Sequence, residues 1–196
     1  VPPVRSPSAL GGAEETAAAT PDPRPAARTA REVARLAGSA VHAALQRWDF
    51  RDAPRLRDLG RQTAARVLEE DAAQATPERR RRVVGETAEI IEEFLRSPLP
   101  ARLASLPLLG REVPVLFRDE TGATWSGACD LVYRDERGRL VIADYKTERL
   151  DGPPAVAAER HRPQMEIYRE AFRRALGETT VVGEILFVRA GVSVAL

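Results

Sequence analysis

The sequence predicts an α/β fold in which a helical cap precedes a three-stranded antiparallel meander, a helix and a further strand. Apolar residues recur at helical spacing through the first half of the chain and change to strand-like patterns at about residue 108. Short glycine-containing turn sequences separate the strand-like segments. A chain of 196 residues, 43% hydrophobic and 30% charged, is typical of one globular domain.

The first residues of the chain differ in composition from the rest. Six of the 15 prolines fall within residues 1–27, among glycine, alanine and threonine, so this segment is expected to be a flexible linker. We expect the folded domain over residues 28–196. Its helical part is predicted at 28–107, and its α/β core, which carries the candidate site, at 108–196.

Three helices are predicted in the helical part. Residues 28–49 and 54–73 carry apolar side chains at helical spacing. A third helix is expected to begin at the N-cap Thr76, which precedes a proline suited to the first turn, and to end near Arg96. The proline-rich residues 98–107 are expected to form an irregular connection.

The second half of the chain predicts strands. A helix interrupts them, beginning at Pro163 and ending at Gly177, a residue typical of helix C-termini. The strands are expected over residues 111–118, 123–133, 139–146, 180–189 and 192–196.

Overall composition limits the class of protein. The net charge of +1 is low for a free-standing DNA-binding protein, so any nucleic acid would have to be delivered by another part of a larger assembly. No apolar run approaches the roughly 20 residues of a membrane span, and no signal sequence is evident, so we expect a fragment of a longer cytoplasmic protein. The single cysteine, Cys129, excludes a four-cysteine iron–sulfur cluster within this chain.

Lys146 is the only lysine among 30 basic residues, and the chain has no asparagine. A codon bias against AT-rich codons explains this composition. Arginine replaces lysine easily on a surface, but not where a slim ammonium with a tunable pKa is needed. The one lysine that remains is therefore a candidate functional residue.

Three carboxylates and this lysine are expected to converge. Asp144 and Lys146 are two apart on a predicted strand and share a face, since side chains on a strand alternate. Asp130 comes late in the preceding antiparallel strand, and Glu112 opens the first strand of the meander. Clustered carboxylates suit Mg²⁺ or Mn²⁺. The alternative is that these residues are strand ends facing water, with Asp144 and Lys146 a surface ion pair.

Several short motifs, in order along the chain, resemble those of RecB-type nuclease domains in the PD-(D/E)xK superfamily, as found in AddA/RecB-like helicase–nucleases. The matching segments are Ser6–Leu10, Gly38–His42 (G-x-x-x-H), Glu112, Gly127–Asp130 (G-x-x-D), Asp144–Thr147 (D-Y-K-T) and Gln164–Tyr168 (Q-x-x-x-Y). The resemblance implies a restriction-endonuclease-like core.

The resemblance also implies a role for each residue. The implied metal ligands are His42, Asp130, Asp144 and the backbone carbonyl of Tyr145. Lys146 would position or deprotonate the attacking water, and Glu112 would support the metal site. Gln164 and Tyr168, four apart on one helix face, would contact the DNA strand.

The resemblance thus implies a nuclease dependent on Mg²⁺ or Mn²⁺, acting as an exonuclease on single-stranded DNA in double-strand-break repair and recombination. Its expected partners are DNA, a helicase domain in the same polypeptide and, as an open alternative, a second helicase–nuclease subunit. Two other readings stay open. One is a stand-alone PD-(D/E)xK nuclease, such as an exonuclease or a junction resolvase. The other is a catalytically inactive module that serves a structural or DNA-guiding role.

Overall fold

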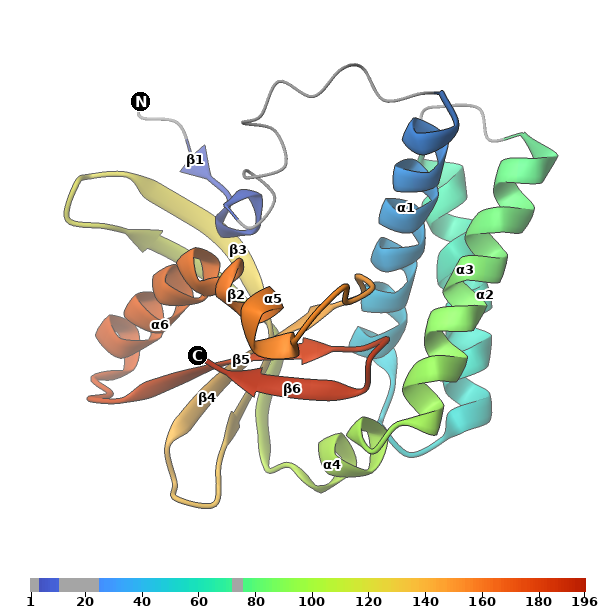
Figure 1. Cartoon of the computed structure of the whole chain (residues 1–196). Coiled ribbons are helices and arrows are strands. Elements are labelled where there is room, and N and C mark those ends of the chain that lie inside the picture. The colour runs from blue at the N-terminus through green and yellow to red at the C-terminus, as the bar shows by residue number, and fades with distance from the viewer. Residues whose placement is uncertain (1–3, 11–24, 72–75) are drawn as a thin grey trace.

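The computed structural model of the chain describes residues 4–10, 25–71 and 76–196. Its first half is a cap of helices packed side by side (Figure 1). The helices of this half are α1 (Pro25–Arg47), α2 (Ala53–Glu70), α3 (Pro77–Arg96) and the short α4 (Leu99–Ser105). The predicted N-cap is confirmed, because the Thr76 hydroxyl accepts a hydrogen bond from the backbone N–H of Arg79 at 3.2 Å.

The second half of the chain, together with a short strand from residues 4–5, forms a mixed sheet in which β3 pairs with three other strands. The strands are β1 (Val4–Arg5), β2 (Leu108–Arg118), β3 (Thr124–Arg134), β4 (Leu140–Lys146), β5 (Val181–Phe187) and β6 (Val192–Ala195). Strand β4 lies antiparallel to β3 and parallel to β5, and β6 returns antiparallel to β5. Helices α5 (Pro154–Glu159) and α6 (Arg162–Leu176) connect β4 to β5.

Strand β3 has two differently occupied edges. Strand β2 pairs with almost its whole length on one edge. On the other edge, β1 pairs with Thr124 and Trp125, and β4 pairs with β3 only from Leu131 onward. Within the described chain, residues 126–130 therefore have no strand partner on that edge, and the candidate site lies next to this gap.

A separate apolar core covers each face of the sheet. The core between cap and sheet includes Val41, Leu45, Trp48, Phe94, Leu131, Tyr133, Val141, Ala143 and Tyr145. The core between α6 and the sheet includes Val132, Leu140, Ile142, Met165, Tyr168, Phe172 and Ile185. Because β4 alternates between the two cores, Asp144 continues the row that faces α6. The α/β class and the meander, helix and strand order are thus as the sequence predicts.

The prediction of a linker is wrong for residues 4–10. Val4 and Arg5 form β1, and a 3₁₀ turn follows at Pro7–Ala9. Pro7 is buried against β3, where a Cβ added at Gly127 would lie 3.3 Å from its Cδ. The free edge of β3 supplies backbone partners that composition alone does not indicate. The prediction is also wrong for residues 25–27, which begin α1, and residues 1–3 and 11–24 lie outside the described residues.

Two short helices were not predicted. Helix α4 lies within the proline-rich residues 98–107, and α5 begins at Pro154. In both, proline occupies the first turn, where its missing N–H costs no hydrogen bond. The prolines therefore mark helix starts rather than irregular chain. No helix of the described residues is long and apolar enough to cross a membrane.

Candidate active site

Asp144 and Lys146 lie at the C-terminal end of β4, where the buried strand gives way to charged side chains. Nζ of Lys146 is 2.7 Å from Oδ2 of Asp144 and donates a hydrogen bond to Oε1 of Gln164 at 3.0 Å. Nε2 of Gln164 donates to Oδ1 of Asp144 at 2.9 Å. The carboxylate and the ammonium therefore share a face, as predicted, and Gln164 on α6 bridges them.

Asp130 lies just beyond the last residue pair of the β3–β4 ladder. That ladder ends where Leu131 pairs with Ala143. Oδ2 of Asp130 then accepts a hydrogen bond from the backbone N–H of Tyr145 at 2.6 Å. The carboxylate supplies an acceptor that the backbone of β3 no longer provides, and this holds Asp130 against the end of β4.

Glu112 faces Asp130 from β2 with a left-handed backbone, φ 47°. Residues other than glycine rarely adopt this backbone conformation, and such strain is concentrated at functional sites. Burial raises the pKa of Glu112, and the charge of Asp130 raises it further, while His42 acts in the opposite direction. Two carboxyl groups thus meet here without an arginine between them.

His42 approaches the same carboxylates from α1. Its Nδ1 lies 3.6 Å from Oδ1 of Asp130, and its ring packs edge-on against Tyr145 with centroids 5.9 Å apart. Burial lowers the pKa of His42, but the hydrogen bond and charge of Asp130 outweigh it, so the net direction is upward. The cap and the sheet therefore each contribute a side chain to one cluster.

A pocket of about 540 Å³ opens beside this cluster. It is lined by Ala34, Arg35, Gly38, Ser39, His42, Ala43, Gln46, Glu112, Asp130 and Thr147. A Cβ added at Gly38 would lie 2.8 Å from Oγ1 of Thr147, so glycine is what allows α1 to approach the end of β4 so closely. The pocket thus gives a ligand access to the carboxylates along α1.

Comparison with known families assigns this arrangement. Residues 16–192 match the model of the PD-(D/E)XK nuclease superfamily, which is most of the chain. The chain belongs to this superfamily. A search of curated proteins found no match. The mixed sheet with helices on both faces agrees with the restriction-endonuclease-like fold that the family implies.

The motif that names the superfamily fits the geometry of this PD-(D/E)XK chain. Asp144, Tyr145 and Lys146 have the (D/E)-x-K pattern, and the assignment of Asp130 to the first aspartate stays a prediction. Cys129 stands where the motif has proline. Cys129 is fully buried in the core between α6 and the sheet, and burial and the two aspartates raise the pKa of its thiol well above the usual value.

The described residues of this PD-(D/E)XK chain contain no ready-made group of three histidine, cysteine, aspartate or glutamate side chains arranged around one point as a metal site. The donor set nevertheless fits a hard divalent cation, since it consists of carboxylates and one imidazole. Oδ2 of Asp144 is buried and has no hydrogen-bond partner apart from the ion pair with Lys146. Burial raises the pKa of Asp144, which Lys146 opposes. The site therefore has three carboxyl groups, with one lysine and one histidine as the basic groups beside them.

Gln164 and Tyr168 lie on one face of α6 near the candidate site, but they are not exposed to solvent. Both side chains are buried, with 1% and 0% of their surface exposed. Gln164 also contacts the hydroxyl of Ser8 at 3.4 Å, and the hydroxyl of Tyr168 approaches Gly127 so closely that a Cβ there would lie 2.7 Å away. Their role as DNA contacts stays a prediction, because residues 4–10 cover them here. The function of Gln164 as a bridge between Asp144 and Lys146 could not be foreseen from a helix-face pattern.

Proposed function

We propose that this domain is a metal-dependent deoxyribonuclease that hydrolyses phosphodiester bonds in single-stranded DNA, as the RecB-type part of a helicase–nuclease. The observation that carries the proposal is the meeting of Asp130, Asp144 and Lys146 where the C-terminal end of β4 leaves the middle of β3, beside an open pocket. The order of these residues along the chain resembles the motif that names the superfamily, which supports the proposal.

The proposed ligands for Mg²⁺ or Mn²⁺ are His42, Asp130, Asp144 and the Tyr145 carbonyl. A divalent cation in such a site polarises a phosphate oxygen and lowers the pKa of water. Lys146 would orient the attacking water and balance charge on the phosphate, since its ammonium already lies within 2.7 Å of Asp144. Gln164 would hold Asp144 and Lys146 in their relative positions. Glu112 would hold Asp130.

A single strand is the favoured substrate within this proposal for two reasons. The pocket runs along α1, with Arg35 and Gln46 as exposed polar groups on its wall. The net charge of +1 is low for a protein that must capture duplex DNA unaided, whereas tethering to a motor supplies a high local concentration of strand. A role in double-strand-break repair and recombination belongs to this same proposal.

A stand-alone nuclease of the same superfamily is an equally open candidate. It uses the same site and differs in how DNA arrives. The two are separated by assaying the chain on linear duplex without any motor: a RecB-type domain should leave duplex intact and degrade single strands, whereas a stand-alone enzyme should attack duplex. An inactive module would cleave neither.

The central test is cleavage of labelled single-stranded DNA in Mg²⁺, in Mn²⁺ and in excess EDTA. We expect cleavage with either metal and none in EDTA. A matched control is Glu92→Gln, which removes a carboxylate from the exposed Arg57–Glu92 ion pair, away from the site. Undiminished cleavage in EDTA would contradict the mechanism.

A further inference from the structure

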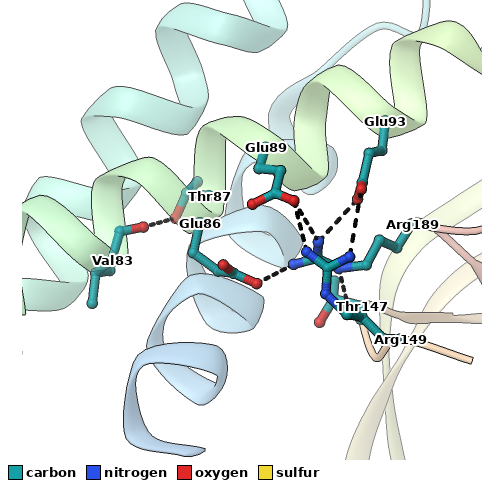
Figure 2. A network of polar contacts seen from close by, with 8 residues as sticks. All are labelled: Val83, Glu86, Thr87, Glu89, Glu93, Thr147, Arg149 and Arg189. Atoms are coloured by element: carbon teal, nitrogen blue, oxygen red, sulfur yellow. Dashed lines mark hydrogen bonds and ion pairs between the residues drawn. The ribbon is translucent and has the colours of Figure 1, made fainter. Parts of the chain in front are cut away.

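Arg189 lies just after β5 and is almost fully enclosed, with 6% of its side chain exposed. Its guanidinium meets the carboxylates of α3: it pairs with Glu86, with Glu93 at 2.9 Å and with Glu89 at 3.7 Å (Figure 2). These glutamates lie on one face of α3 because they are three and four residues apart. A guanidinium is suited to this position, since its planar fork serves several acceptors at once.

The same guanidinium also contacts the residue that follows β4. Nε of Arg189 donates to the carbonyl of Thr147 at 3.3 Å, and the backbone N–H of Val188 donates to the carbonyl of Lys146 at 2.8 Å. The chain after β5 therefore runs beside the chain after β4. Figure 2 shows the guanidinium of Arg189 lying between the α3 glutamates and Thr147. One side chain connects the cap to the residue that follows Lys146.

Thr147 is the point where the two halves of the site meet. Its carbonyl faces Arg189, its side chain lies against Gly38 on α1, and it lines the pocket. Gly38 is one helical turn before His42. Thr147 therefore lies between the helix that carries His42 and the strand that carries Lys146, and its contacts connect the two.

A second arginine completes the network. Nη2 of Arg149, two residues beyond Thr147, contacts Glu89 at 2.6 Å, and its Nη1 lies 3.7 Å from Glu93. Arg149 is largely exposed, with 59% of its side chain accessible, whereas Arg189 is not. Exposed ion pairs contribute little, so Arg189 is the member of the network that holds the geometry.

We infer that Arg189 is a positioning residue: held by Glu86 and Glu93, it fixes the Thr147 carbonyl and so keeps Asp144 and Lys146 at working distance from His42. The inference rests on the proposed metal-dependent hydrolysis, because its consequence is felt at the metal ligands. It goes beyond that proposal in assigning a function to a side chain outside the site. Groups outside a metal site that orient its ligands contribute strongly to metal affinity, and Arg189 is placed to act in this way.

The test compares Arg189→Met with Arg57→Met in the full chain. Arg57 is the matched control, because it also pairs with a glutamate of α3, at 2.5 Å from Glu92, but it connects only α2 and α3. Two quantities are measured at a temperature where circular dichroism shows every variant folded. The first is amide hydrogen exchange of the peptide spanning residues 143–150, without metal. The second is Mn²⁺ binding by calorimetry.

We expect Arg189→Met to speed exchange across residues 143–150 and to weaken Mn²⁺ binding on the order of tenfold, as for the loss of groups that orient metal ligands. Arg57→Met should match the wild type in both. Arg189→Lys should recover thermal stability more than Mn²⁺ affinity, because an ammonium restores the charge but not the fork. A purely structural ion pair would recover both together.

Unchanged exchange and unchanged Mn²⁺ affinity in folded Arg189→Met would overturn the inference, whatever the melting temperature. If that variant does not fold, Glu93→Gln removes one partner of Arg189 and is judged by the same two measurements. A wild type that neither binds Mn²⁺ nor cleaves DNA, while Arg189→Met still exchanges faster, would instead reject the proposed function and leave the positioning of the β4 end standing.

Discussion

Two groups of three carboxylates in this molecule have opposite surroundings. The α3 carboxylates are Glu86, Glu89 and Glu93, and they face the guanidinium groups of Arg149 and Arg189. Each α3 carboxylate has an arginine within ion-pair distance, and the hydrogen bond from Arg149 lowers the pKa of Glu89. Within this group, every carboxylate faces a guanidinium, although three carboxylates share two arginines.

The site carboxylates are Glu112, Asp130 and Asp144, and they face one another. Their nearest basic groups are one lysine and one histidine, and burial raises the pKa of both Glu112 and Asp144. The difference teaches that a carboxylate cluster alone does not indicate a metal site. Carboxylates that face one another, instead of each facing an arginine, gain more from a cation supplied from outside, and this supports the proposed metal site.

Removing a site carboxylate should have the largest effect on function. We expect Asp130→Ala and Asp144→Ala each to reduce DNA cleavage by at least about 10³-fold, since each removes a proposed ligand of the cation that would act on the phosphate. Glu86→Gln should stay within tenfold of the wild type. Cleavage is measured as initial rate under saturating Mg²⁺, with circular dichroism as the check of folding. Comparable losses in all three variants would erase the distinction between the two groups.

Lys146→Arg sharpens the comparison by giving the site the cation that the α3 carboxylates already have. We expect roughly a 10²-fold loss of cleavage, close to that of Lys146→Ala, because arginine stays protonated and presents a wide fork where a slim ammonium fits. The measurement is the rate at saturating Mg²⁺. Wild-type rates in Lys146→Arg would reduce Lys146 to a residue retained by chance.

Metal should stabilise the folded protein by binding the site carboxylates and not the α3 carboxylates. At a Mn²⁺ concentration of 100 times its Kd, binding to the folded state adds about 2.7 kcal/mol to the free energy of unfolding. We expect a rise in melting temperature in the wild type and in Glu89→Gln, and none in Asp144→Ala. An equal rise in all three would place the bound metal elsewhere. The readout is differential scanning fluorimetry across a Mn²⁺ titration.

The smallest expected effect concerns the pH dependence of stability without metal. Glu112 and Glu89 should contribute to it with opposite signs. The pKa of Glu112 is raised on folding, so its share of stability is present below the ordinary carboxyl pKa and is lost as the pH rises through the raised value. The pKa of Glu89 is lowered, so its share is lost as the pH falls.

Glu112→Gln should therefore gain stability over the wild type as the pH rises from about 4 to 7, whereas Glu89→Gln should lose it over the same range. The measurement is the urea midpoint at several pH values in EDTA. Because Glu89 is largely exposed, its change should be slight. The same slope in both variants would show that the two environments do not differ as described.

Local sequence patterns were sufficient for most of the fold. Alternation and glycine turns predicted the meander, and Thr76 predicted the start of α3, because each depends on residues close in sequence. The segment at residues 4–10 could not be predicted this way, since its partners on β3 lie more than a hundred residues away. Distant contacts of this kind leave little trace in composition.

The candidate site was predictable to a different degree. Asp144 and Lys146 share a face because strands alternate, and that holds for any strand. The left-handed backbone of Glu112 and the burial of Gln164 depend on tertiary packing, so spacing did not predict them. The contact between Arg189 and Thr147 joins residues 42 positions apart, and no motif includes it.

Lys146 carries the only side-chain amine of the 196 residues, and 19% of its side chain is exposed. Acylating reagents that target lysine can therefore modify this chain's side chains at a single atom, and that atom lies in the site. Attachment to a sensor surface through this lysine, with the α-amine blocked, would orient the protein with the end of β4 against the support. Conversely, protection of this one amine from acylation offers a direct titration of occupancy, read by mass spectrometry on a single peptide.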